Sequence, residues 1–160
     1  MDKIDIRYAE EKDSLLLLGF IRELAEYEKL LDKVEITEEQ LIEDLFRLKR
    51  AYAFILFENN KPAGFALYYY TYSTFAGRPG LYLEDLFVKP EYRKRGYGKK
   101  LLAFLAKEAI RNNCFRVDWS VLNWNKPSIE FYKSIGADKI QDWLVFRLPE
   151  ENFNELGNLV

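Results

Sequence analysis

The sequence predicts a single α/β domain in which strands and helices follow one another in the order β-α-α-β-β-β-α-β-α-β. The chain has 160 residues, which is the length of one typical domain. It is 49% hydrophobic, with only 8 glycines and 5 prolines, so disorder and low complexity are excluded. Segments with strand-like alternation are interspersed with segments of helical periodicity, and no repeat or linker divides them. We therefore expect one domain over residues 1–160.

The first part of the chain predicts one strand and two helices. Apolar residues alternate with polar ones over residues 4–8, as in a strand. Asp13 is placed to cap a helix that runs to about Leu30. The apolar face of that helix comprises Leu17, Phe20, Ile21, Leu24 and Leu31. The segment Thr37–Gln40 has the spacing of a capping box, which predicts a second helix over Glu38–Leu48.

Three strands are predicted next. Tyr52–Glu58 and Ala63–Tyr72 are rich in β-branched and aromatic residues, and the turn residues Asn59–Pro62 between them predict a hairpin. Ser73–Gly80 is expected to be a loop. Leu81–Val88 is a further apolar run of strand length.

The remaining chain predicts two helices and two strands. Gly98–Asn112 has helical periodicity and is expected to bury one face. That face comprises Leu101, Leu102, Leu105, Ala106 and Ala109. Phe115–Val121 predicts a strand, Ser128–Ser134 a short helix after a proline, and Trp143–Leu148 a last strand.

The composition excludes several kinds of site. The chain contains no histidine, so a Ser-His-Asp triad, a Cys-His pair and a histidine-ligated metal are impossible, and we expect no metal. Its single cysteine excludes an internal disulfide and favours a reducing compartment. The net charge of −2 argues against general nucleic-acid binding. Any chemistry must therefore use carboxylates, phenols, hydroxyls and backbone groups.

The sequence carries no sign of export or of a membrane span. Its charged start, residues 1–13, lacks the apolar stretch of a signal peptide. Apolar runs such as Leu15–Ile21 are far shorter than the ~20 residues of a membrane-spanning helix. We expect a soluble, cytoplasmic protein with no membrane partner.

The segment after Val88 predicts an anion-binding turn. A basic stretch with Gly96 and Gly98 separates the strand from the long helix, and unpaired amides at a helix N-terminus favour anions. Residues 89–100 carry six basic residues against one acidic, a net charge of +5 on an otherwise acidic chain. The cations Lys99 and Lys100 stand in the first helical turn, where the helix dipole disfavours them unless an anion is bound.

The turn does not match the two common phosphate-binding motifs. A dinucleotide-binding fingerprint would need a third glycine where Leu101 stands, and no Gly-x-x-x-x-Gly-Lys-Ser/Thr motif occurs. A solvated basic turn is the remaining alternative. The strand before the turn and the amphipathic helix after it favour anion binding over that alternative.

The motif Arg93-x-x-Gly96-x-Gly98 resembles the signature of the GNAT acetyltransferase superfamily, which wraps the pyrophosphate of acetyl-CoA. Further segments are similar to its spermidine/spermine (diamine) and thialysine N-acetyltransferase branch: Tyr27-Glu28, Tyr82–Asp85, Pro90–Arg93, Asn123–Asn125, Pro127-Ser128, Phe131–Lys133 and Gly136-Ala137. The resemblance covers Ile4 to about Leu148. It implies a mixed, mostly antiparallel sheet flanked by helices, a homodimer, and acetyl-CoA as acyl donor with CoA as product.

The resemblance also implies a set of cofactor-binding residues. The backbone of Leu86, Phe87 and Val88 would hold the pantetheine arm. The pyrophosphate would lie against Arg93, Lys94, Arg95, Gly96, Tyr97, Gly98 and Lys99, and the thioester end against Asn125, Ser128 and Tyr132. Tyr132 would be the general acid toward the departing sulfur; ordinary packing of a tyrosine in a short helix is the alternative.

Glu84 and Asp85 are adjacent carboxylates in an apolar strand. Regular alternation predicts that Glu84 shares a face with Tyr82, and Asp85 with Leu83. A wet face or buried salt bridges would also explain the pair, because unpaired buried charges are costly. Their place just before the basic turn favours a functional role. The resemblance implies that Glu84 helps to bind the amine and to deprotonate it.

The amine itself is less well defined. Residues 1–44 carry a net charge of −8, which is typical of a solvated helical face. The resemblance implies that Tyr27, Glu28 and Glu84 bind a cationic amine, and that Asp118, Trp119 and Ser120 line the acceptor site. Residues 73–75 read Ser-Thr-Phe where the spermidine/spermine type has Asp-Pro-Trp, which is similar to the thialysine type.

These observations predict an acetyl-CoA-dependent N-acetyltransferase for a small primary amine, either a thialysine-like amino acid or a polyamine. Cys114 has no histidine to activate it, so direct transfer in a ternary complex is expected. Two alternatives stay open: a CoA-binding sensor or interaction module that has lost catalysis, and a protein or peptide N-acetyltransferase.

Overall fold

The computed structural model describes residues 2–160 and divides into two compact units, which are described in turn; the first ends at Trp124 and the second begins at Asn125. The first unit holds a five-stranded sheet in the order β1-β2-β3-β4-β5. The strands are β1 (Ile4–Tyr8), β2 (Tyr52–Glu58), β3 (Lys61–Ser73), β4 (Arg78–Val88) and β5 (Val117–Trp119). Neighbouring strands are antiparallel except for β4 and β5, which are parallel.

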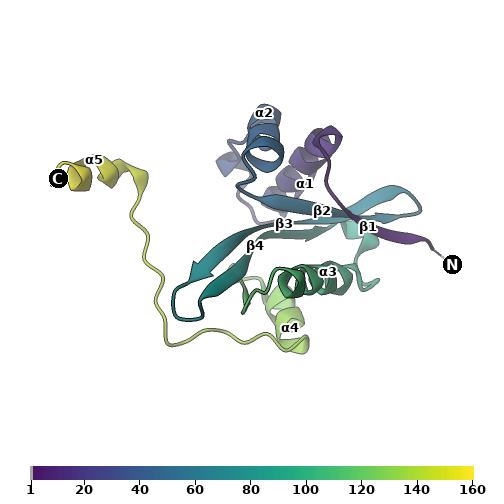
Figure 1. Cartoon of the computed structure of the whole chain (residues 1–160). Helices are drawn as coiled ribbons and strands as arrows, with labels where there is room; N and C mark the ends of the chain where they lie inside the picture. Colours follow the sequence, from purple (N-terminus) through teal and green to yellow (C-terminus); the bar gives the residue numbers. More distant parts are fainter. Residues whose placement is uncertain (1) are drawn as a thin grey trace. The chain divides into compact units, whose positions relative to one another are not determined.

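Helices cover both faces of this sheet. The α-helices of the first unit are α1 (Ser14–Tyr27), α2 (Glu38–Leu41) and α3 (Tyr97–Arg111). Figure 1 shows α1 and α2 on one side of the sheet and α3 on the other. Shorter helical turns span Glu11–Asp13, Leu31–Lys33, Ile42–Arg47 and Pro90–Tyr92. This arrangement confirms the predicted mixed, mostly antiparallel sheet flanked by helices.

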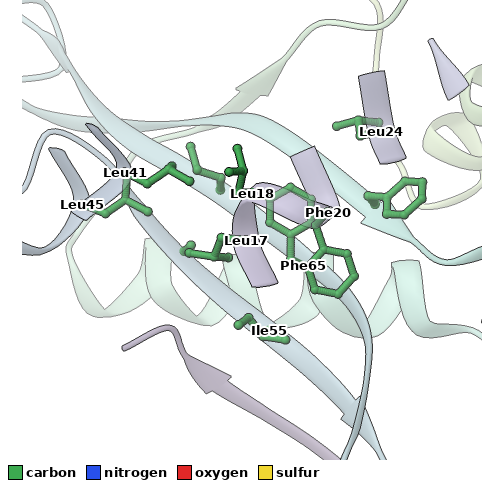
Figure 2. Packing of buried hydrophobic residues seen from close by; sticks show 11 residues of the cluster. Leu17, Leu18, Phe20, Leu24, Leu41, Leu45, Ile55 and Phe65 are labelled. Atoms are coloured by element: carbon green, nitrogen blue, oxygen red, sulfur yellow. The ribbon is translucent and has the colours of Figure 1, made fainter. Parts of the chain in front are cut away.

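The main core lies between α1 and the sheet. Leu17, Phe20 and Leu24 of α1 are buried against Ile55 and Phe65 of the central strands (Figure 2). The ring of Phe20 stacks on that of Phe65 with 5.1 Å between centroids. Full burial of one such aromatic side chain contributes about 2–3 kcal/mol, so this layer fixes the sheet beneath α1.

Helix α1 is shorter than predicted, whereas the second predicted helix spans nearly its expected length. Helix α1 ends at Tyr27 because Lys29 adopts a left-handed conformation with φ of 62°. Leu31 therefore lies beyond the helix, and its side chain is exposed rather than part of the apolar face. The carboxylate of Asp13 does not cap α1 as expected, since it pairs with Arg7 at 2.7 Å. The Thr37 capping box is confirmed, although the helix continues as a π-helix over Ile42–Arg47.

The face of α3 toward the sheet contains one position that sequence pattern assigned wrongly. Leu101, Leu105 and Ala109 are buried as predicted, but Ala106 is exposed and Glu108 is buried. The carboxylate of Glu108 is tolerated there because Tyr8 and Tyr70 donate hydrogen bonds to it, the latter at 3.1 Å. A buried carboxylate with such donors replaces an apolar contact without leaving an unpaired charge.

A bulge interrupts the pairing of β4 with β3. Leu67 pairs with Asp85 and Tyr68 with Leu83, so Glu84 is an extra residue with no partner on β3. Leu83 therefore faces the α3 side together with Tyr68, whereas Asp85 faces the α1 side with Leu67. The expectation from regular alternation, that Asp85 and Leu83 share a face, is wrong for this reason.

The second unit contains α4 (Lys126–Ser134), a turn over Glu150–Asn152 and α5 (Phe153–Gly157). The predicted last strand, Trp143–Leu148, is wrong: the segment has no strand partner among residues 2–160. The side chain of Trp143 is 79% exposed and that of Phe146 is 90% exposed. A strand needs a neighbour to satisfy its backbone groups, which an apolar sequence pattern alone does not provide. Among the described residues, no helix is long and apolar enough to cross a membrane.

Candidate functional site

The turn between β4 and α3 opens on the helix N-terminus. Gly96 is the N-cap of α3 and has φ of 78°, a conformation that side-chain-bearing residues rarely adopt. A Cβ atom placed there would meet no heavy atom within 4 Å, so the space beside the turn is open. Since glycine has no side chain, no N-cap side chain bonds to the first-turn amides of α3. Lys94, two residues before Gly96, also has a left-handed conformation, with φ of 61°.

Two cations of the turn, Arg93 and Lys89, make contacts with neighbouring elements. The Nε of Arg93 donates to the carbonyl of Val88 at 2.9 Å. Its guanidinium lies 5.0 Å from the centroid of the Tyr27 ring and 5.5 Å from that of Phe87. Arg93 thus connects the end of β4 to the end of α1, as a guanidinium stacked on aromatic rings can. Lys89 lies 3.8 Å from a carboxylate oxygen of Glu23.

Arg95 is held by a buried carboxylate. Its Nη1 lies 2.8 and 3.1 Å from the two carboxylate oxygens of Glu58, at the end of β2. The exposed cations that remain at the turn are Lys94, Lys99 and Lys100, which have no ion pair among the described residues 2–160. These three lysines supply the positive charge that faces solvent beside Gly96.

The edge of β4 that leads into this turn is open. β5 pairs with β4 only through Leu81–Leu83. Beyond Leu83 no strand among the described residues covers this edge, so backbone groups over residues 84–87 remain available on that side, whereas the Val88 carbonyl accepts from Arg93. Leu86, Phe87 and Val88, predicted from the resemblance to bind the cofactor through their backbone, lie along this open stretch and at its end. An exposed strand edge is suited to an extended ligand with amide groups.

Three carboxylates gather where the bulge lies. Glu84 is exposed, Glu28 at the end of α1 is half-buried, and Asp85 is half-buried beneath the α1 face. Burial, followed by the charges of Glu84 and Glu28, raises the pKa of Asp85 to about 7. Burial and the charge of Glu84 also raise the pKa of Glu28. This part of the site therefore has a negative potential that a cation would relieve.

Aromatic rings border these carboxylates. The rings of Tyr69 and Tyr82 stack with 5.1 Å between centroids. The hydroxyl of Tyr82 is 2.8 Å from that of Ser120, which ties the end of β5 to β4. Near the end of α1, the rings of Tyr27 and Trp124 are 6.1 Å apart. Burial, followed by the charge of Glu84, raises the pKa of Tyr69, so this phenol stays neutral.

Asp118 and Trp119, predicted to line the acceptor site, lie on the short strand β5. Asp118 pairs across the strands with Tyr82, and its carboxylate is held by Arg116 at 2.7 Å. Trp119 pairs with Leu83 and is half-buried. The ion pair with Arg116 leaves Asp118 with less charge to offer an amine than a lone carboxylate would have.

The other predicted residues belong to the second unit. Asn125 is the N-cap of α4, and its Oδ1 accepts a hydrogen bond from the Ser128 amide at 3.4 Å. Tyr132 lies in α4, half-buried, with its ring centroid 5.6 Å from that of Phe131. Within this unit the three residues are therefore organised by one short helix.

Sequence analysis missed two members of the site. Tyr69 sits within the run Tyr68–Tyr70, where alternation offered no reason to prefer one phenol over another. Glu58 was treated only as the end of a strand. A signal for Glu58 did exist, because an acidic residue that ends an otherwise apolar strand needs a partner. Among the described residues, no group of acidic or cysteine side chains could hold a metal ion.

Comparison with known proteins bears on this geometry. The family model described as "Acetyltransferase (GNAT) family" matches residues 19–137. The chain is 42% identical to a thialysine N-epsilon-acetyltransferase of Bos taurus, over 95% of this chain and 96% of that protein. It is 35% identical to the human spermidine/spermine N(1)-acetyltransferase-like protein 1, over 98% of this chain and 24% of that longer protein.

Solved structures show the same architecture. An integron cassette protein from the mobile metagenome of V. cholerae superposes with a TM-score of 0.81 at 30% identity, over 96% of this chain and 97% of that one. An aminoglycoside N-acetyltransferase in complex with CoA superposes with a TM-score of 0.74 at 19% identity, over 92% of this chain and 96% of that one.

Proposed function

Since the chain belongs to the GNAT acetyltransferase family, we propose that it transfers an acetyl group from acetyl-CoA to the primary amine of a small cationic acceptor. A thialysine-like amino acid is the first candidate acceptor, because the thialysine acetyltransferases match over nearly their whole length. A polyamine is the second, supported by the spermidine/spermine acetyltransferase-like relative.

The turn before α3 fits the pyrophosphate of acetyl-CoA. Gly96 provides no side chain to cap the first-turn amides, and exposed lysines add positive charge beside it. In this proposal Arg93 and Lys94 flank the pyrophosphate, and the backbone of Gly96–Lys99 binds it. When bound, acetyl-CoA supplies an activated acetyl thioester.

The open edge of β4 is the observation that carries the proposal. On the side away from β3, residues 84–87 present backbone groups that no strand among the described residues uses, and this stretch leads directly into the basic turn. The pantetheine arm contains amides that can pair with such an edge as an added strand does. Glu84 stands on the same stretch, so a bound thioester and a carboxylate would share one edge of the sheet.

Glu84 is the proposed base for the acceptor. An alkylamine has a pKa of about 10.4, so it arrives protonated and must lose a proton before it can attack. Glu84 is exposed at the bulge, where its carboxylate can take that proton directly or through water. Glu28 and Asp85 add negative charge that attracts the ammonium group. Tyr27, Asp118, Trp119 and Ser120 are the further proposed acceptor-site residues.

Tyr132 is the proposed acid that protonates the departing sulfur, with Asn125 and Ser128 lining the same end of the site. Direct transfer to the amine is supported by the state of Cys114. Burial, together with the charge of Glu108, raises the pKa of its thiol, which therefore stays protonated and poorly nucleophilic.

We further propose that residues 1–160 act as one N-acetyltransferase domain, that the protein is a homodimer and that it works in the cytoplasm. The apolar segment Trp143–Leu148 supports the dimer, because its large side chains are mostly exposed in one copy of the chain. The single free cysteine is consistent with a reducing compartment.

An amine panel tests the activity. Release of free thiol from acetyl-CoA is measured with S-aminoethyl-cysteine, spermidine and lysine, each against a blank without amine. We expect thiol release that depends on the amine and is fastest with S-aminoethyl-cysteine. Tight CoA binding without turnover on any amine would favour a sensor module, and acetylation of peptides alone would favour a protein N-acetyltransferase.

A further inference from the structure

The carboxylate of Glu58 lies beneath the start of α3, and the acetyl-transfer proposal gives it no role. Glu58 ends β2, and its residue is only 8% exposed. It accepts hydrogen bonds from Arg95 Nη1 at 2.8 and 3.1 Å and from the phenol of Tyr97. Tyr97 is 5% exposed, and burial, together with the bond to Glu58, raises the pKa of its phenol, which is therefore a neutral donor.

The two donors are the immediate neighbours of Gly96. Arg95 precedes it and Tyr97 follows it, so one buried carboxylate holds both sides of the residue whose backbone opens the turn. Arg95 is also tied back to its own turn, since its Nη2 donates to the carbonyl of Glu91 at 3.1 Å. Its guanidinium lies 5.4 Å from the centroid of the Tyr92 ring.

We propose that Glu58 is a positioning residue for the acetyl-CoA turn: it fixes Arg95 and Tyr97, and through them the left-handed conformation of Gly96 and the direction of the first-turn amides of α3. Arg95 then serves the cofactor through Glu58 rather than by binding phosphate itself. This inference rests on the proposed function, because it takes the turn to be the pyrophosphate site.

Charge and position predict opposite effects of removing the carboxylate. By Coulomb's law alone, the loss of a negative charge next to a basic turn would strengthen the binding of an anionic cofactor. If Glu58 acts by position, its loss frees the turn and weakens that binding in spite of the more favourable charge. The direction of the change therefore separates the two explanations.

The first experiment uses Glu58→Gln, which keeps the size of the side chain. We expect the KM for acetyl-CoA to rise about tenfold. This is the lower end of the loss in affinity or activity seen when a residue that orients a ligand of a metal site is removed. The kcat at saturating acetyl-CoA and the KM for the amine should stay close to wild type. Glu91→Gln is the matched control, because it removes the same charge from an exposed side chain of the same turn and should not raise the KM.

A double-mutant cycle with Arg95→Gln tests whether Arg95 affects cofactor binding through Glu58. If Arg95 acts through Glu58, the double variant should bind CoA no more weakly than the worse single variant in calorimetric titration. Additive losses would mean that Arg95 contacts the phosphates independently, and would overturn the proposal. An unchanged or tighter affinity in Glu58→Gln would overturn it as well.

Two further variants distinguish an error in the role of Glu58 from an error in the proposed cofactor site. If Glu58→Gln does not fold, Tyr97→Phe removes only one hydroxyl from the same contact, and we expect a smaller rise in the KM for acetyl-CoA with kcat unchanged. No rise in that variant would then count against the proposal. Gly96→Val tests the turn itself: normal CoA affinity there would refute the proposed cofactor site, whereas weakened affinity with a normal Glu58→Gln would refute only the role of Glu58.

Discussion

The substitution Asp85→Asn should make the protein more stable at neutral pH and above, and leave its stability unchanged below about pH 4. Asp85 faces the α1 side of the sheet opposite Leu67, on the face that carries the main core. Burial is the main reason that its pKa rises from 3.8 to about 7, and the charges of Glu84 and Glu28 add to it. The folded state thus resists ionisation of this carboxyl, which the unfolded chain does not.

The magnitude follows from that difference. Each pKa unit corresponds to about 1.4 kcal/mol, so a rise of about three units would cost about 4 kcal/mol once Asp85 is ionised. Because the residue is only half-buried, solvent reduces this figure, and we expect about 2 kcal/mol. The raised pKa means that the protonated form stabilises the fold below about pH 4, and that this contribution disappears as the pH rises through about 7.

Urea unfolding of wild type and Asp85→Asn at several pH values between about 4 and 8 measures the effect. The variant should gain stability over wild type as the pH rises, with most of the gain between about pH 4 and 7. Asp5→Asn is the matched control, since Asp5 is an exposed strand aspartate, and its difference from wild type should not follow this profile. A variant that is less stable than wild type at every pH would refute the reasoning, because it would show that ionised Asp85 is well accommodated.

Three other substitutions test separate contacts. Tyr132→Phe should lower kcat by about tenfold or more while the KM for acetyl-CoA stays near normal in steady-state kinetics, and full activity would show that the thiolate departs without this proton. Asp13→Asn should lose about 1–2 kcal/mol near neutral pH in urea unfolding, because the hydrogen bond from Arg7 lowers the pKa of Asp13 and stabilises the ionised form; the loss should shrink as the pH falls below the ordinary value of 3.8 and the folded carboxyl becomes protonated. Glu108→Ala should cost about 2–3 kcal/mol, since it leaves the Tyr70 hydroxyl without its acceptor, and a fully stable variant would contradict the hydrogen-bond assignment.

Local pattern was sufficient for most of the fold because the signals repeat over several residues. Residues 52–58 were predicted with the bounds that β2 has, since hydrophobic residues fill the strand and an Asn-Asn turn follows it. The capping box at Thr37 was predicted from two side chains three residues apart. The ends of α1 and the strand expected at Trp143–Leu148 failed for another reason. They depend on one backbone angle at Lys29 and on a strand partner, neither of which periodicity encodes.

The candidate site was predictable where a residue type suited to the chemistry stands at a recognisable place in the chain, such as a turn between a strand and a helix. Gly96 stands at the start of α3 as expected, and its left-handed conformation is one that glycine adopts with less strain than other residues. What sequence could not provide was the partner of each charge. Arg95 was grouped with the phosphate-binding cations, yet the structure pairs it with Glu58, 37 positions earlier in the chain. Such pairings arise from the register of β2 under α3, which is a tertiary property.

Glu84 is the extra residue of the β4 bulge, and the proposed mechanism uses its carboxylate as the base. Leu83 and Asp85 already stand opposite successive residues of β3, Tyr68 and Leu67. A chain lacking residue 84 could therefore close an unbroken ladder with every remaining side chain on its present face. Strand pairing between β3 and β4 therefore does not depend on residue 84. Under the proposed mechanism the same residue supplies the base, so it would be dispensable for the sheet and required for turnover.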